Sequence, residues 1–448
     1  MKMKVLKFGG TSVGSASQMK EVAQLITDSN KKIVVLSAMS GTTNTLVEIG
    51  DYLYKKNPEG ANEIINQLES KYRSHIDELY NTDEYKQRAQ IAIKENFDTI
   101  RTYTKDLFTL FEEKVILSQG ELISTKMMTL YLQEQGVSAV LLPALEYMRT
   151  DKNASPDLAY TRAHLQTLIE ETPEADIYIT QGYICRNAYG EVDNLQRGGS
   201  DYTASLIGAA VNASEIQIWT DIDGMHNNDP RIVEHTTPVR YLNFDEAAEL
   251  AYFGAKILHP TCIQPAKYAN IPVRLLNTMD PQAPGTLISN ETELARIKAV
   301  AAKDNITAIQ IKSSRMLLAY GFMRKVFDIF ESHKTAIDMV CTSEVGVSVT
   351  IDNTKSLNSI VNDLKMYGTV TVNKDMCILC VVGDLQWSNV GFESAVVAAM
   401  KNVPVRMISY GGSNYNISFL VNQKDKKVAL QSLSDALFVQ KEEDKEKK

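Results

Sequence analysis

At 448 residues the chain is too long for one compact core, so two or three domains are expected. The apolar share of 44% and the charged share of 23% are ordinary for a globular protein, and the net charge of −8 argues against a nucleic acid or an anionic membrane as partner. No apolar run approaches the ~20 residues of a membrane span, and the first residues, MKMKVLKF, lack the apolar core of a signal peptide. We therefore expect a cytoplasmic protein.

The first notable stretch is KVLKFGGTSVG, in which a short apolar strand at 3–8 runs into Gly9-Gly10, two hydroxyl residues and a helical pattern. A strand, glycines, hydroxyls and a helix start together present backbone N–H groups to an anion. Lys7 adds a positive charge, although this is not a Walker A loop, where the lysine follows the glycines. Alone, the stretch also fits an ordinary tight turn.

Strands and helices then alternate as far as PQAPG at 281–285, which we interpret as a boundary turn. Strands are predicted at 31–39, 137–142, 176–183, 215–220 and 271–276, and helices at 18–27, 58–135, 158–170, 201–211 and 245–253. Within 58–135, SQGE at 118–121 is expected to interrupt the helical pattern before a new helix at 122–133. The alternation indicates a largely parallel sheet, which binds ligands at the carboxyl ends of its strands.

Beyond the boundary turn the predicted order is βαββαβ, and it then begins again. The first repeat has strands at 306–311, 337–341, 345–351 and 369–372 and helices at 322–330 and 356–366. The second has strands at 377–382, 405–410 and 415–421 and helices at 392–401 and 427–438. Its last strand is missing, because the terminal KEEDKEKK is too charged to be buried. We expect the run IKAVAAK at 297–303 to replace it.

The cysteines fit a reducing compartment, because they are scattered and odd in number: Cys185, Cys262, Cys341, Cys377 and Cys380. The pair Cys377-x-x-Cys380 lies in MCILCVV, a strand-like run in which positions three apart point to opposite faces. No second Cys or His pair lies near it in the sequence. We therefore expect core thiols rather than a metal or redox site.

Four polar clusters lie at predicted turns of the first half: 7–12, 196–201, 220–224 with 229–231, and 254–260. Singly, each fits a turn, a helix cap or a lysine at a helix end. Together they offer two lysines, two arginines, two glycine-lined helix starts and several carboxylates. This is the equipment of phosphoryl transfer, in which charge on the phosphoryl oxygens is held and little covalent help is needed.

These clusters resemble the motifs of a known family. KFGGTSV, SQGELIST, RGGSDYTA, WTDIDG with DPR, and FGAKILHP resemble, in order, the motifs of aspartate kinases of the amino-acid kinase family. The second half resembles their tandem ACT regulatory domains, and the similarity runs from residue 3 to about residue 438. Within that family, the regulatory half resembles the effector site of the monofunctional, lysine-sensitive enzymes.

The resemblance implies an α/β fold of an amino-acid kinase domain at 1–295, with a largely parallel sheet between helices, and two ferredoxin-like βαββαβ ACT domains. These would lie at 304–375 and 376–440, the second completed by 297–303, with a disordered tail at 441–448. It implies ATP-dependent phosphorylation of the L-aspartate β-carboxylate to 4-phospho-L-aspartate, the first step toward lysine, threonine, methionine and, in many bacteria, diaminopimelate. Mg²⁺ would bridge the phosphates with few protein ligands of its own. A homodimer through the ACT domains is expected, and further pairing of dimers is left open.

The resemblance also implies residue roles. The catalytic set is Lys7, Asp201 and Lys256. The ATP set is Lys7, Phe8, Gly9, Gly10, Thr220, Asp221, His226, Arg231, Lys256 and Ile257. The aspartate set is Thr43, Glu121, Arg197, Gly198, Gly199 and Ser200, in which Arg197 would pair with the α-carboxylate and Glu121 would accept from the α-ammonium. An amino-acid effector, lysine in preference to threonine, would meet Met316, Gly321, Phe322, Met323, Ile337, Asp338, Thr342, Ser343, Glu344 and Val345.

Three positions depart from the family pattern: Gln196 replaces a glycine, His226 a tyrosine and Ala336 a serine. Each departure affects one expected ligand contact, and we still expect the kinase activity. The rival interpretations are an amino-acid kinase acting on glutamate, acetylglutamate or a nucleotide, and a non-catalytic amino-acid sensor. The lack of a G-x-G-x-x-G unit after the regulatory half argues against a fused dehydrogenase.

Overall fold

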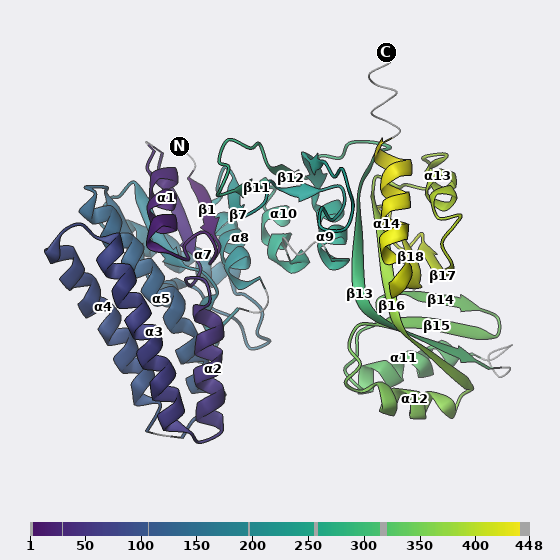
Figure 1. The fold of residues 1–448 in the computed structure, drawn as a ribbon, viewed down its shortest axis with the longest axis horizontal. Coiled ribbons are helices and arrows are strands. Elements are labelled where there is room, and N and C mark those ends of the chain that lie inside the picture. Colours follow the sequence, from purple (N-terminus) through teal and green to yellow (C-terminus); the bar gives the residue numbers. More distant parts are fainter. Residues whose placement is uncertain are drawn as a thin grey trace, which may run out of the picture. The chain divides into compact units, whose positions relative to one another are not determined.

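The computed structural model describes residues 3–28, 30–105, 107–195, 198–254, 259–313 and 320–439 (Figure 1). By its contacts the chain divides into two compact units. The first comprises Met1–Met225 and Ile257–Asn290, and the second comprises His226–Lys256 and Glu291–Lys448. The functional boundary expected at residue 295 stays a prediction. Among the described residues, no helix is long and apolar enough to cross a membrane.

The first unit is built on a sheet with the strand order β12-β11-β7-β1-β2-β4-β3. Neighbouring strands are parallel except β11 and β12. The strands are β1 (Lys4–Phe8), β2 (Lys32–Leu36), β3 (Ala139–Leu142), β4 (Ile177–Gln181), β7 (Ile216–Thr220), β11 (Val273–Asn277) and β12 (Thr286–Ser289). The central strands β1, β2 and β4 are apolar and buried almost throughout, as expected where both faces of a parallel sheet are covered.

Helices cover this sheet, and in Figure 1 the long α3, α4 and α5 run side by side. The helices of this unit are α1 (Ala16–Ile26), α2 (Thr42–Tyr54), α3 (Pro58–Leu79), α4 (Asp83–Thr102), α5 (Leu110–Glu134), α6 (Ala144–Tyr147), α7 (Leu158–Glu171), α8 (Gly199–Val211) and α10 (Gln264–Tyr268), with a 3₁₀ turn at Pro260–Ile263. Side chains of α1, α2, α3, α4 and α5 share one apolar core with β1, β2 and β4. A short hairpin of β5 (Ile184–Arg186) and β6 (Val192–Asn194) completes the unit.

The predicted interruption at 118–121 is wrong, because α5 runs unbroken through these residues. The helix begins earlier, at a capping box in which Thr109 and Glu112 bond each other's backbone N–H groups. Gly120 serves close packing instead of a break: a Cβ there would lie 2.7 Å from the Cβ of Ala38. The polar residues beside it are buried, so their polarity does not mark a loop.

The predicted boundary turn at 281–285 is also wrong as a boundary, because the sheet continues beyond it. The turn joins β11 to β12 as a hairpin. Gly285 has a φ of +66°, and a Cβ there would lie 1.9 Å from the carbonyl oxygen of Leu275. The glycine is therefore required by the close approach of two backbones inside one sheet.

The second unit contains a sheet with the order β14-β15-β13-β16-β18-β17, whose neighbours are antiparallel. Its strands are β13 (Ile297–Lys312), β14 (Val340–Ser343), β15 (Gly346–Ile351), β16 (Thr369–Gly383), β17 (Val405–Tyr410) and β18 (Asn416–Asn422). The helices are α9 (Phe244–Tyr252), α11 (Phe322–Ser332), α12 (Leu357–Lys365), α13 (Phe392–Ala399) and α14 (Lys426–Ser434), with a π-helical turn at Asp435–Val439. Short strands β8 (Met225–His226), β9 (Pro238–Val239) and β10 (Tyr241–Asn243) precede α9.

Two long strands, β13 and β16, each run through both repeats, whereas the sequence predicts separate short strands. The first part of β13, Ile297–Lys303, pairs with Ile378–Gly383 of β16, and its second part, Ile306–Lys312, pairs with Thr369–Met376. Segment 297–303 therefore occupies the place of the last strand that the second repeat lacks. Separate apolar cores lie under α11 and α12 and under α13 and α14.

Candidate active site

An ion pair at the carboxyl end of β1 joins two of the predicted motifs. The Lys7 ammonium lies 2.8 Å from Asp201 Oδ1, and the two side chains are only 11% and 13% exposed. Lys7 is held on a central strand, between β2 and β7, and Asp201 is in the first turn of α8. The ion pair thus restricts the long Lys7 side chain and fixes its positive charge where β1 meets the glycine turn.

The glycine turn itself is shaped by backbone contact with the turn after β2. A Cβ on Gly10 would lie 2.8 Å from the carbonyl oxygen of Ala38, closer than side chains tolerate. A Cβ on Gly9 would meet only the Lys7 ammonium, at 3.5 Å. Gly10 is therefore required for two strand-end turns to pack together, whereas Gly9 leaves space beside the lysine.

A pocket of about 500 Å³ opens at these turns. Thr43, Glu121, Gly199 and Ser200 of the predicted aspartate set line it together with Gly10, and the other lining residues are Thr11, Ser37, Ala38, Met39, Ser40, Gly41, Asn44 and Tyr183. Two helices begin at its wall. α2 starts after Gly41 and α8 after Gly198, both with positive φ. The free N–H groups of two helix starts suit a ligand with two anionic ends.

Glu121 supplies the opposite charge from the middle of α5. Glu121 is 4% exposed, and its Oε1 accepts a hydrogen bond from the Ala38 N–H at 3.2 Å. Its Oε2 has no hydrogen-bond partner among the described residues. Burial raises the pKa of Glu121 from 4.5 to about 7, because the charged form loses water. A ligand cation at Oε2 would satisfy that oxygen and restore the charge.

Among the lining residues outside the predicted set, Ser37 and Tyr183 contact the start of α8. Ser37 Oγ donates to Ser200 Oγ at 2.9 Å, which ties the end of β2 to the start of α8. Tyr183 has a φ of +69°, and its ring lies 2.5 Å from where a Cβ on Gly199 would be. The sequence carries a signal only for Ser37, which follows a buried strand at its carboxyl end.

The predicted nucleotide residues of the first unit differ in exposure. Thr220 ends β7 beside β1, its Oγ1 accepts from the Ile222 N–H at 3.2 Å, and the Asp221 that follows is exposed. Phe8 is fully buried and stacks on Trp219 with ring centroids 5.6 Å apart, so its side chain belongs to the core. Only the backbone of Phe8 is available to a ligand.

His226 and Arg231 belong to the second unit. The Nδ1 atom of His226 lies 3.1 Å from the hydroxyl of Thr236, and the guanidinium of Arg231 pairs with Asp229 at 2.8 Å. Four predicted site residues lie outside the described residues: Arg197, Lys256, Ile257 and Met316. Gln196, one of the departures from the family pattern, lies outside them too.

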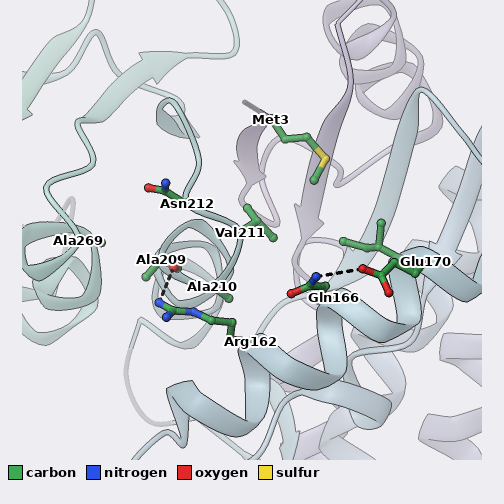
Figure 2. A pocket seen from close by; sticks show the side chains of 10 residues that line it. Met3, Arg162, Gln166, Glu170, Ala209, Ala210, Val211, Asn212 and Ala269 are labelled. Atoms are coloured by element: carbon green, nitrogen blue, oxygen red, sulfur yellow. Dashed lines mark hydrogen bonds between the residues drawn. The ribbon is translucent and has the colours of Figure 1, made fainter. Parts of the chain in front are cut away.

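A second pocket of about 600 Å³ lies at the opposite edge of the sheet, beside Met3 (Figure 2). Three of its polar side chains are bonded within the protein. Arg162 donates to the carbonyl oxygen of Ala209 at 3.2 Å, and Gln166 donates to Glu170 at 2.9 Å. This pocket contains none of the predicted site residues and lies at the amino ends of the strands.

The predicted effector residues that are described lie in three segments of the first repeat. Gly321 and Phe322 start α11, with Met323 next to them. Asp338 precedes β14, and beside it Ile337 packs on the apolar core. The remaining residues lie in and around the β14–β15 turn: Thr342, Ser343, Glu344 and Val345.

Among the predicted effector residues, Asp338 makes two side-chain contacts that the sequence does not predict. Its side chain is 2% exposed and meets the Lys303 ammonium at 2.7 Å and the Tyr252 hydroxyl at 3.0 Å. Burial raises the pKa of Asp338, and Lys303 opposes that rise. No local pattern in the sequence links the three residues.

Known proteins resemble both halves of the chain. The Amino acid kinase family model matches residues 2–277, and an ACT domain model matches residues 379–437. Aspartokinase 1, chloroplastic, of Arabidopsis thaliana is 36% identical over 97% of this chain and 80% of its own length. Lysine-sensitive aspartokinase 3 of Escherichia coli K12 is 33% identical over 97% of this chain and 99% of its own.

Solved structures agree. Escherichia coli aspartokinase III in complex with aspartate and ADP has a TM-score of 0.81 at 32% identity, over 98% of this chain and 100% of that one. Clostridium acetobutylicum aspartate kinase has a TM-score of 0.83 at 26% identity, over 97% and 100%. The predicted family and fold class are thereby confirmed. The chain belongs to the aspartokinases of the amino acid kinase family and is an aspartate kinase.

Proposed function

We propose that aspartate binds in the pocket lined by Glu121 and that ATP is held at the glycine turn after β1. The observation that carries this proposal is the buried Glu121 carboxylate, with one oxygen open, in a pocket where two helices begin. Aspartate has one ammonium and two carboxylates, which matches one buried carboxylate and two helix starts. A crystallised Escherichia coli relative is described as a complex with aspartate and ADP, which supports the assignment.

In the proposed reaction an oxygen of the substrate β-carboxylate attacks the γ-phosphorus of ATP, and the bond from that phosphorus to ADP breaks. The carboxylate is ionised at neutral pH, so no general base is needed. Lys7, held by Asp201, offsets charge on the phosphoryl oxygens, where one well-placed donor is worth about 10²–10³ in rate. Lys256 would assist the same transfer, and Arg197 would bind the α-carboxylate. The Lys7 charge and the glycine-turn N–H groups fit a phosphate chain, whose Mg²⁺ would need few protein ligands.

We further propose that an amino acid, lysine in preference to threonine, inhibits the enzyme at the effector residues around Asp338. An Escherichia coli relative is named lysine-sensitive, and its structure is described as a complex with lysine and aspartate in a T-state. The enzyme would be cytoplasmic and begin the route to lysine, threonine and methionine. It would form a homodimer through the ACT domains of the second unit, with the two copies related by a two-fold axis.

The test is the formation of aspartyl hydroxamate with Mg-ATP, measured with and without millimolar lysine or threonine. We expect product from aspartate and none from glutamate, since a longer chain would move the reacting carboxylate. Lysine should reduce the rate more than threonine. Turnover of glutamate in preference to aspartate would overturn the substrate assignment.

A further inference from the structure

A charge cluster around the buried Asp338 side chain joins the effector segment to α9 in the second unit. The Lys303 ammonium lies 2.7 Å from Asp338 and 3.0 Å from Asp352, and it sits 4.4 Å from the centre of the Tyr252 ring. The Tyr252 hydroxyl donates to the same Asp338 oxygen at 3.0 Å. The other oxygen, Oδ2, is buried and has no partner among the described residues. Two carboxylates thus face one ammonium, which leaves the cluster able to accept one more cation.

The cluster also fixes the end of α9 on the regulatory sheet. Tyr252 is the last residue of α9, and Lys303 lies in β13. Two residues further on, Gly254 has a φ of +116°, and a Cβ there would lie 2.1 Å from the carbonyl oxygen of Ala302. The backbone at Gly254 therefore lies directly against β13, one residue before Lys303. In the sequence, Lys256 follows Gly254 by two residues.

We propose that the contact of Tyr252 and Lys303 with Asp338 is the regulatory link through which an effector amine acts on the end of α9 and on Gly254. The inference rests on the proposed effector site at Asp338 and adds how its occupation is transmitted. An ammonium group that binds Asp338 Oδ2 competes with Lys303 and Tyr252 for one buried carboxylate. Lys303 then moves to Asp352, which is already within 3.0 Å.

The consequence is a loosened hold on the end of α9. With the effector ammonium on Oδ2, the Asp338 carboxylate accepts more weakly from the Tyr252 hydroxyl, and Lys303 is repelled from the ring face by a like charge. Tyr252 and Gly254 are then held less firmly against β13. Because the contact belongs to the effector-free state, it opposes effector binding, and linkage requires that weakening the contact strengthens binding.

Two variants of the full-length enzyme test this with opposite expected signs. Tyr252→Phe removes the hydrogen bond to Asp338 and keeps the ring, so the half-inhibitory lysine concentration should fall by about fivefold or more. Asp352→Asn removes the alternative acceptor and holds Lys303 on Asp338, so that concentration should rise. The side chain of Asp352 is 45% exposed, which makes the substitution tolerable. A general structural disturbance would move both variants in the same direction.

The matched control is Tyr241→Phe, an exposed tyrosine of the same unit whose backbone carbonyl, and not its hydroxyl, accepts from Lys298. It should leave the lysine response unchanged and kcat without lysine within about twofold of wild type. Tyr252→Phe, which removes part of the hold on α9, should also lower kcat without lysine. An unchanged or raised half-inhibitory concentration in Tyr252→Phe overturns the link while leaving the effector site standing. A wild-type enzyme that neither lysine nor threonine inhibits overturns the effector proposal and this inference together.

Discussion

The Lys7 ammonium and the Asp201 carboxylate form an ion pair of 2.8 Å, although the two residues belong to separate motifs, one on β1 and one on α8. Both side chains are almost buried, so the pair is screened little by solvent and holds the lysine in one position. The pair brings the glycine turn after β1 next to the start of α8.

Replacement of Lys7 tests the charge at the glycine turn. Lys7→Ala should lower kcat by at least about 10- to 100-fold, because a charged hydrogen bond to the transferred phosphoryl group is lost. The rate of aspartyl hydroxamate formation at saturating substrates measures this. The matched control is Lys31→Ala, because Lys31 pairs with Glu174 on the exposed surface and should matter little for activity. A Lys7→Ala enzyme of wild-type activity would contradict the role.

The pH dependence of aspartate binding tests Glu121. Burial raises the pKa of Glu121 from 4.5 to about 7, and only its ionised form attracts the substrate ammonium. In the free enzyme kcat/KM for aspartate should therefore rise with pH up to about 7 and level off above it. At saturating aspartate, kcat should depend less on pH, since the bound ammonium favours the ionised carboxylate.

Glu121→Gln keeps the shape of the side chain and removes its charge. It should raise KM for aspartate by roughly 10-fold or more, leave KM for ATP nearly unchanged, and abolish the rise of kcat/KM toward pH 7. Glu113→Gln, on the same helix but bonded to the Tyr54 hydroxyl, is the control and should retain the wild-type profile. The assignment is wrong if Glu121→Gln and wild type share the same pH profile.

The two adjacent glycines should differ in their tolerance of a methyl group. Gly10→Ala places a Cβ 2.8 Å from the Ala38 carbonyl oxygen and forces the turn to move, so kcat/KM should fall roughly tenfold or more. Gly9→Ala meets only the flexible end of Lys7 and should lose less. Gly412→Ala, with open space and no positive φ, should be neutral. Equal losses for Gly9→Ala and Gly10→Ala would show that backbone crowding is not the cause.

Thiol labelling tests the predicted core cysteines, all five of which lie among the described residues and are thiols. Burial raises the pKa of Cys185 and of Cys377 to about 12, and that of Cys380 is raised too, so their thiolates are scarce. Only Cys341 is partly exposed. A disulfide reagent should react quickly with at most one thiol of the native enzyme, and Cys341→Ser should remove that reaction. Rapid reaction of two thiols would favour a redox role for Cys377 and Cys380.

Much of the fold follows from local patterns in the sequence. The buried strands are apolar runs of the right length, and the regulatory helix α11 buries the predicted face of Phe322, Val326, Ile329 and Phe330. The clusters that contain Lys7, Gly10 and Asp201 could be located because they stand at strand ends and helix starts, where parallel sheets place their ligand sites. The roles of the single residues were predicted from the resemblance to aspartate kinases.

The sequence by itself determined the order of elements, the repeat in the second half and the motifs at the strand ends, because these depend on periodicity and neighbouring residues. Tertiary structure alone decided which distant groups meet. The sequence around Gly120 suggests a helix break, whereas the structure shows that the glycine allows close packing against Ala38. The sequence places Glu121 at the same break, whereas the structure buries it in α5 and thereby raises its pKa. The same holds for Asp338, whose partners Lys303 and Tyr252 come from a strand and a helix that no local pattern connects.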